Sequence, residues 1–181
     1  MVDLANARTP PAVSATPAVT PLPPASRYIL RGGPEVRAAA ESALGVGIPA
    51  TACRAAVAAD RAALWLGPDE WLLIGPAAPA EMIPQLLAAP LRALNHSLVD
   101  VSHRQSALVV RGPEAALLLA AGCPLDLDPG AFPVGMCTRT MLAKAEVVLW
   151  RTDAEAFRLE VWRSFVAYVD EFLREAARGI N

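Results

Sequence analysis

The sequence predicts an α+β fold made of two related β-α-β-β units, with mainly antiparallel sheets packed with helices. Residues 29–49 and 109–127 both read as a strand, Arg-Gly, Pro-Glu, an Ala/Leu-rich helix, a glycine and a further turn containing proline. Each segment is followed by short apolar strands separated by turn residues, which is typical of an antiparallel meander. A duplicated strand–helix–meander unit explains both observations.

The first unit begins with a strand at 27–32. The helix predicted at 33–45 has Pro34 at its first helical position and Gly45 at its end, which are the preferred places of these residues. Two apolar strands, 61–68 and 70–76, are connected by a Gly-Pro-Asp turn and predict a hairpin. A helical region follows at 78–94, where Pro84 and Pro90 limit the regular length.

The second unit begins with strands at 96–102 and 105–112 and a helix at 113–121. Between Glu114 and Asp126 the chain carries no charge, and a helix that is apolar all round is buried on more than one side. Leu118 is therefore a candidate contact residue, either within the domain or against another subunit. A loop at 123–135 leads to strands at 137–142, 145–152 and 157–162. The last helix is expected to begin at Ser164, which is a good N-cap residue.

The N-terminal segment differs from the rest in composition. Residues 1–26 are rich in proline, so we expect an extended or disordered arm there. The folded domain is predicted to occupy residues 27–181.

Composition excludes several classes of protein. The net charge of −2 gives no reason to expect binding to nucleic acid or to an anionic membrane. The longest uncharged apolar run, 115–125, is shorter than the roughly 20 residues that a membrane-spanning helix needs. Three widely spaced cysteines and no recognisable signal peptide favour a reducing, cytoplasmic location.

The segment 100–106, Asp-Val-Ser-His-Arg-Gln-Ser, contains the three side chains of a hydrolase triad. If the strand continues through it, Ser102 and His103 point to opposite faces, and a catalytic relay requires them to touch. We therefore interpret Asp100 and Ser102 as groups that bond to backbone at a strand end. His103 and Arg104 are interpreted as candidate subunit-contact residues.

Other catalytic and cofactor motifs are missing from the sequence. It has neither a Gly-rich dinucleotide fingerprint nor a phosphate-binding loop, and its two histidines lack metal-ligand spacing. The four tryptophans fall in apolar strands and suggest core or interface packing. We therefore assign no catalytic, cofactor-binding or metal-binding residue to this chain.

A resemblance to a known family covers most of the chain. Residues 100–127 resemble the Asp-Val-Ser-His strand and Gly-Pro helix start of the aminomethyltransferase (T-protein) folate-binding fold. Three further segments, 67–76, 122–151 and 159–173, resemble the gamma subunit of heterotetrameric sarcosine oxidase. The resemblance extends over roughly residues 27–178.

The resemblance implies a non-catalytic subunit that supports assembly of a complex. Such a complex oxidatively demethylates sarcosine to glycine and passes the one-carbon unit to tetrahydrofolate. The implied partners are alpha and beta subunits and a small delta subunit, and FAD, FMN, NAD and tetrahydrofolate are implied on those partners. Two alternatives remain open: the equivalent subunit of an N-methylglutamate dehydrogenase-type complex, and a small stand-alone folate-dependent one-carbon transferase.

Overall fold

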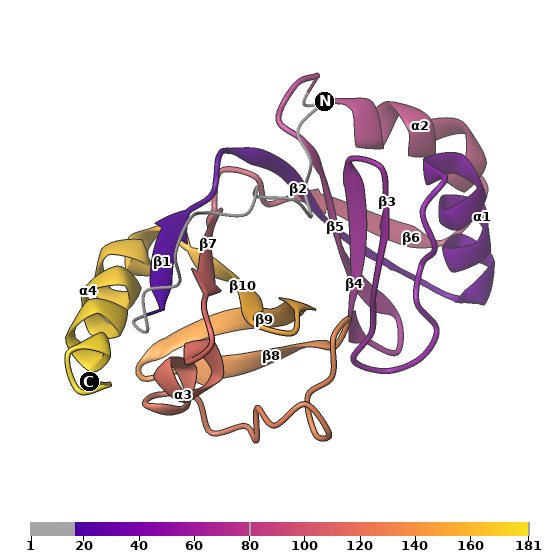
Figure 1. Cartoon of the computed structure of the whole chain (residues 1–181). Helices are drawn as coiled ribbons and strands as arrows, with labels where there is room; N and C mark the ends of the chain where they lie inside the picture. Colours follow the sequence, from indigo (N-terminus) through magenta and orange to yellow (C-terminus); the bar gives the residue numbers. More distant parts are fainter. Residues whose placement is uncertain (1–16, 80, 181) are drawn as a thin grey trace. The chain divides into compact units, whose positions relative to one another are not determined.

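The computed structural model describes residues 17–79 and 81–180. Within them the chain divides into two compact units, Pro24–His103 and a second unit made of residues 17–23 and 104–180 (Figure 1). Of the predicted N-terminal arm, residues 1–16 lie outside the described part of the chain. The division into an arm at 1–26 and a folded domain at 27–181 stays a prediction.

The first unit contains one sheet and two helices. Its order along the chain is β2 (Ala25–Gly32), α1 (Pro34–Leu44), β3 (Ala55–Ala58), β4 (Arg61–Gly67), β5 (Glu70–Pro76), α2 (Met82–Leu91) and β6 (His96–Asp100). The five strands lie in the order β3-β4-β5-β2-β6, and every neighbouring pair is antiparallel.

The second unit repeats this arrangement. Its order along the chain is β7 (Gln105–Arg111), α3 (Ala115–Ala120), β8 (Cys137–Leu142), β9 (Ala145–Asp153), β10 (Ala156–Trp162), the 3₁₀ turn η1 (Arg163–Phe165) and α4 (Val166–Ala177). The strand β1 (Ala18–Pro21) completes an antiparallel sheet in the order β1-β7-β10-β9-β8.

The two sheets correspond strand for strand. In each unit a strand and a helix precede a three-strand meander, and the first strand lies beside the last strand of that meander. This confirms the α+β prediction of two related β-α-β-β units. The outer position beside the first strand is filled by β6 in the first unit and by β1 in the second.

Several boundaries differ from the sequence-based expectations. Strands β1 and β3 were not expected, and α3 is shorter than the predicted helix at 113–121. The prediction that Ser164 caps the last helix is wrong: Ser164 lies inside η1, and α4 follows with no side-chain cap bond. A short 3₁₀ turn is common at the N-terminus of an α-helix.

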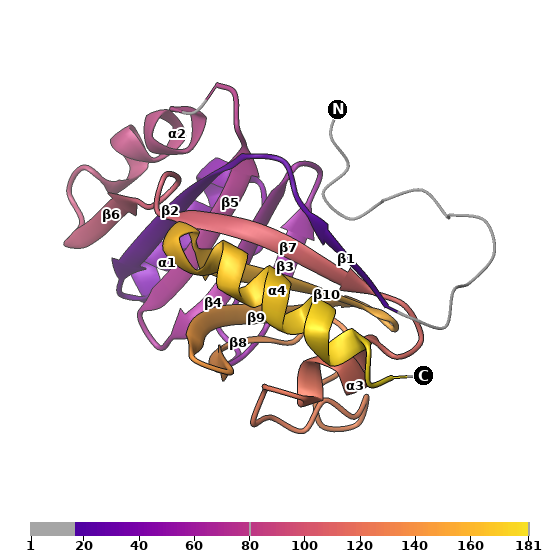
Figure 2. The ribbon, with the colours of Figure 1, turned by 90° about the vertical axis from the view of Figure 1, so that its left-hand side faces the viewer.

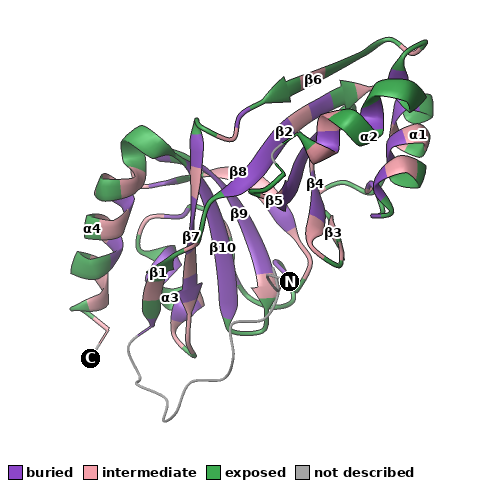
Figure 3. Ribbon diagram, turned by 90° about the horizontal axis from the view of Figure 1, so that it is seen from above, coloured by how far each residue is buried: buried purple, intermediate pink, exposed green. Residues whose placement is uncertain are grey.

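The core of the first unit lies between its sheet and its two helices (Figure 1). Residues at helical spacing point inwards, namely Val36, Ala40 and Leu44 from α1 and Ile83, Leu87 and Leu91 from α2. The repeat of three and four residues places each triplet on one helical face. The opposite helix faces are exposed, as the green and purple colouring in Figure 3 shows.

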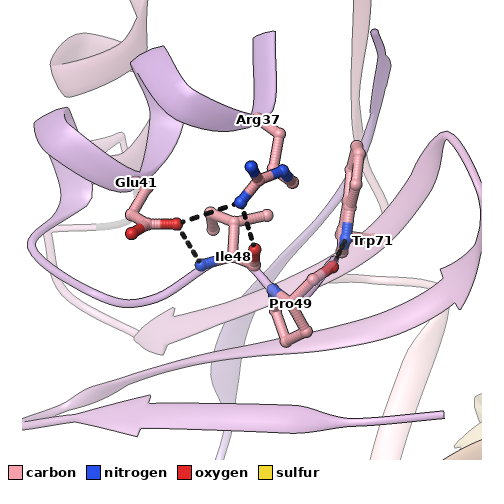
Figure 4. A network of polar contacts seen from close by, with 5 residues as sticks. All are labelled: Arg37, Glu41, Ile48, Pro49 and Trp71. Atoms are coloured by element: carbon pink, nitrogen blue, oxygen red, sulfur yellow. Dashed lines mark hydrogen bonds and ion pairs between the residues drawn. The ribbon is translucent and has the colours of Figure 1, made fainter. Parts of the chain in front are cut away.

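The loop between α1 and β3 is tied down by side chains (Figure 4). Gly45 ends the helix in the left-handed conformation, with φ of 63°. The Ile48 N–H donates to the Glu41 carboxylate at 3.2 Å, and Arg37 donates to the Ile48 carbonyl at 3.1 Å. The Trp71 indole N–H donates to the Pro49 carbonyl at 2.8 Å. These bonds hold Ile48 in the core, where it is 2% exposed.

The core of the second unit lies between its sheet, α3 and α4. Figure 2 shows α4 lying along one face of this sheet, and its Val169 and Leu173 are fully buried. From α3, Leu118 and Leu119 are 0% exposed, whereas Leu117 is 57% exposed. Within the described chain α3 is therefore buried on one side, and the expected burial on more than one side is not seen there.

We predict that Leu118→Asp destabilises the second unit by about 4 kcal/mol or more, because it removes a packed side chain and buries an unpaired charge. The matched control is Leu117→Asp. Its side chain reaches water near the N-terminus of α3, so the expected change is within about 0.5 kcal/mol. Chemical denaturation of both variants checks this, and equal stability of the two would contradict the packing described here.

Candidate functional site

The segment 100–104 is a turn rather than a continuous strand. Strand β6 ends at Asp100, residues 102–104 form the turn, and β7 begins at Gln105. The predicted strand at 96–102 therefore ends two residues earlier than expected, and the strand does not continue through the segment. The Asp100 carboxylate accepts the Ser102 N–H at 2.8 Å, an Asx-type bond that redirects the backbone.

The Ser102 side chain links this turn to strand β2 by hydrogen bonds. Its hydroxyl oxygen accepts the Arg27 N–H at 2.9 Å, and its hydroxyl group donates to the Arg27 carbonyl at 3.3 Å. The Val101 N–H donates to the same carbonyl at 2.9 Å. The Ser102 side chain thus bonds both backbone groups of Arg27 at the point where β6 has ended. The interpretation of Asp100 and Ser102 as backbone-bonding residues at a strand end is confirmed.

The same bonds affect the ionisation of Asp100. The Ser102 hydroxyl and then the Ser102 N–H hold the pKa of the Asp100 carboxyl below its ordinary value, and the nearby His103 adds to this. The single hydroxyl proton can point to Asp100 or to the Arg27 carbonyl, and in both orientations the oxygen accepts the Arg27 N–H. Across the sheet, burial raises the pKa of the Tyr28 phenol, and the charges of Asp100 and Glu81 raise it further.

This geometry supports a structural role for the segment rather than nucleophilic catalysis. The Ser102 hydroxyl is engaged with the backbone of β2, and no hydrogen bond joins it to His103 in the described residues. Within residues 17–79 and 81–180 there is no group of three or more His, Cys, Asp or Glu side chains that could hold a metal ion. Among the described helices, none combines the length and apolar character that a bilayer crossing needs.

The predicted contact residues separate into surface and core. His103 and Arg104 are exposed, and the boundary between the two units falls between them. Leu118 is fully buried in the core of the second unit, so its candidacy as a surface contact is corrected. The exposed leucine of α3 is Leu117, because α3 turns only one face to the sheet.

Arg104 belongs to a surface that the sequence did not reveal. Its guanidinium carbon lies 5.1 Å from the ring centroid of Trp162, and its carbonyl accepts the Arg163 N–H at 2.8 Å. Trp162 is 40% exposed and Phe165 is 39% exposed. Of the other three tryptophans, Trp71 and Trp150 are buried at 2% and 5% exposed, and Trp65 on β4 is half-buried. In the sequence, this surface is indicated only by a tryptophan at the last position of a strand with an arginine next to it.

Comparison with known proteins assigns the family. The model of the "Sarcosine oxidase, gamma subunit family" matches residues 31–179. The chain belongs to the sarcosine oxidase gamma subunit family. The sarcosine oxidase gamma subunit of Corynebacterium sp. (strain U-96) is 40% identical over 145 residues, which cover 77% of this chain and 67% of that protein. The corresponding subunit of Corynebacterium sp. (strain P-1) is 38% identical over 140 residues, covering 77% and 68%.

Solved structures agree with this assignment. A chain of the heterotetrameric sarcosine oxidase from Corynebacterium sp. U-96 matches with a TM-score of 0.85 and 33% identity, covering 93% of this chain and 88% of that one. The aminomethyltransferase T of Bartonella henselae matches with a TM-score of 0.64 and 13% identity, covering 88% of this chain and 45% of that one. The second similarity concerns the fold alone and confirms the expected aminomethyltransferase-like architecture.

We predict that the stabilising effect of the Asp100 charge disappears in acid. Because its pKa in the folded chain lies below the ordinary value of 3.8, the charge stabilises the fold above that pH. The effect is lost as the pH falls through the lowered pKa. Urea denaturation over a pH series should therefore show wild type and Asp100→Asn differing most at neutral pH and converging in acid.

The control for this pH series is Asp128→Asn, which removes a carboxylate from another turn of the chain. It corrects for the general effect of losing one negative charge. A difference between wild type and Asp100→Asn that stays constant at all pH values would exclude the proposed role of the Asp100 charge.

Proposed function

We propose that this chain is the non-catalytic gamma subunit of a heterotetrameric sarcosine oxidase, and that it supports assembly of the complex. The observation that carries the proposal is the family match over residues 31–179, together with the fold similarity to a chain of a heterotetrameric sarcosine oxidase. The bonding of Ser102 to the Arg27 backbone supports a non-catalytic role, because the hydroxyl is committed to the fold.

The assembled complex would oxidatively demethylate sarcosine to glycine and transfer the one-carbon unit to tetrahydrofolate. We propose alpha, beta and small delta subunits as its partners, in the cytoplasm. FAD, FMN, NAD and tetrahydrofolate would be bound by those partners. In the aminomethyltransferase-like segment of this chain, the Ser102 hydroxyl already bonds to both backbone groups of Arg27, which supports a structural role for this side chain.

The experiment that tests the proposal is co-expression of this chain with the other sarcosine oxidase subunits of its source. Purification through a tag on this chain should recover a complex of four different subunits that oxidises sarcosine, with its composition read by native mass spectrometry. Recovery of this chain alone, with the other subunits present and folded, would overturn the proposal.

The chain expressed alone should be colourless and should produce no hydrogen peroxide from sarcosine. The reason is that flavin binding is assigned to the partner subunits. Absorption spectra and a peroxide assay on the purified chain check this prediction. A stoichiometric flavin spectrum, or one-carbon transfer to tetrahydrofolate by the lone chain, would instead favour a stand-alone enzyme.

Within the complex, Ser102→Ala should leave turnover within a few fold of wild type, whereas loss of a true nucleophile typically costs several orders of magnitude. Stability should fall by about 1–3 kcal/mol, because the Arg27 N–H loses its acceptor. The control is Ser97→Ala, an exposed position on β6. Turnover is expressed per assembled complex, and a thousand-fold loss there would mean that Ser102 reacts.

A further inference from the structure

Four residues of the second unit form a surface that combines exposed aromatic rings with arginine. We call this surface, made of Arg104, Trp162, Arg163 and Phe165, the Trp162 patch. All four residues are exposed, and Trp162 and Phe165 are among the largest exposed apolar side chains of the described chain. Trp and Arg are the residues that most often dominate the binding energy of protein interfaces.

Contacts inside the second unit restrict three of the four side chains of the patch. Strand pairing places Trp162 opposite Gln105, and Arg104 stacks on the Trp162 ring at 5.1 Å. Phe165 meets Tyr168 edge to face with ring centroids 6.4 Å apart. Tyr168 in turn stacks on Phe172 at 6.5 Å. Because contacts already restrict Arg104, Trp162 and Phe165, binding a partner costs less of the conformational entropy of these three side chains.

The patch carries two positive charges, and the exposed Glu146 lies on the neighbouring strand β9, one position beyond the Val161–Val147 pair. The two segments that form it, 101–113 and 161–169, contain no acidic residue. Within residues 17–79 and 81–180, no salt bridge neutralises Arg104 or Arg163. The nearest acidic residue on the same strand, Glu160, is 1% exposed and accepts two bonds from Arg158 at 2.8 and 2.6 Å. Asp170 on α4 is likewise bonded, to Arg174 at 2.8 Å.

We infer that the Trp162 patch is the docking site for an acidic segment of a partner subunit, with carboxylates against Arg104 and Arg163 and apolar side chains against Trp162 and Phe165. The inference rests on the proposed function. Two arginines beside two large rings match a protein surface better than a nucleic acid or a lipid headgroup layer, which are bound through many cations. The net charge of −2 on the whole chain also disfavours a polyanion.

The test uses the co-expressed complex. Arg163→Glu breaks no side-chain hydrogen bond or ion pair within residues 17–79 and 81–180, so it should leave the fold intact while placing like charges at the interface. We expect it to weaken subunit association by about ten-fold or more, and Trp162→Ala to weaken it by about thirty-fold, as hot-spot residues do. Dissociation constants are measured by dilution of the purified complex, and the Arg163→Glu effect should shrink at high salt.

Matched controls lie outside the patch. Arg92→Glu makes the same charge change at an exposed arginine of the first unit. Leu86→Ala, at 37% exposed, is the apolar counterpart of Trp162→Ala at 40%. Both controls should assemble like wild type. Thermal denaturation of each variant chain alone identifies any loss of folding.

A charge-swap experiment tests whether the partner segment is acidic. A photoreactive amino acid placed at position 163 in the complex should cross-link to a segment containing Asp or Glu, identified by mass spectrometry. Replacing that acidic residue by arginine should then restore assembly with Arg163→Glu. Cross-linking to a segment without acidic residues, or no rescue, would overturn the inference.

The outcomes separate this inference from the proposed function. If the wild-type chain does not assemble with the other subunits, the proposed function fails. If wild type assembles and the Trp162 patch variants do so equally well, only the inference fails. If the variants instead abolish self-association of this chain, or its binding to anionic vesicles, the occupant is a second copy or a membrane and the inference is overturned.

Discussion

The buried guanidinium of Arg151 organises the second unit. It is 4% exposed and donates to the carbonyls of Leu127 at 3.1 Å, Phe132 at 3.0 Å and Ala154 at 2.6 Å. The same group lies 4.9 Å from the ring centroid of Phe157. A buried carbonyl without a donor costs about 1–3 kcal/mol, so a single arginine makes it possible for the loop after α3 to enter the core.

That constraint explains how the two units can share one architecture while their helix-to-strand loops differ. In the first unit the loop from 45 to 54 is short, and Glu41, Arg37 and Trp71 satisfy it from neighbouring elements (Figure 4). In the second unit the loop runs from 121 to 136 and carries Leu127 and Phe132 into the core, at 5% and 1% exposed. A longer loop with buried backbone requires a donor that reaches several carbonyls at once, and arginine has that geometry.

The duplicated units carry different surfaces. At the end of β6, Asp100 and Ser102 direct their polar groups into a turn and onto β2. At the end of β10, Trp162 and the η1 turn present aromatic rings and arginine to solvent. The chain belongs to a family of sarcosine oxidase gamma subunits. Aspartate and serine occur in catalytic sites of other proteins, but here Asp100 and Ser102 stabilise a turn. The exposed Trp162 and Arg104 are of the types that are common in protein interfaces, which agrees with a role in assembly.

Much of the fold could be predicted from local signals. Pro34 and Gly45 mark α1, and the apolar strands around the Gly-Pro-Asp turn mark the β4–β5 hairpin. The edge strand β1 could not be predicted, because its proline-rich sequence becomes a strand only by pairing with β7. The strand at 96–102 was predicted two residues too long for a similar reason. Ser102 bonds to Arg27, which lies 75 positions away in the sequence.

The sequence by itself determined the α+β class, the duplication and the family, because these depend on periodicity, turn chemistry and motif order along the chain. It also indicated that Asp100 and Ser102 bond to backbone. Only the tertiary structure decided which exposed residues gather into one surface and which leucine of α3 faces water. Leu117 and Leu118 are neighbours of the same type, and burial separates them because a helix turns about 100° per residue against a single sheet face. Arg104 and Trp162 are far apart in the sequence, and the pairing of β7 with β10 brings them together.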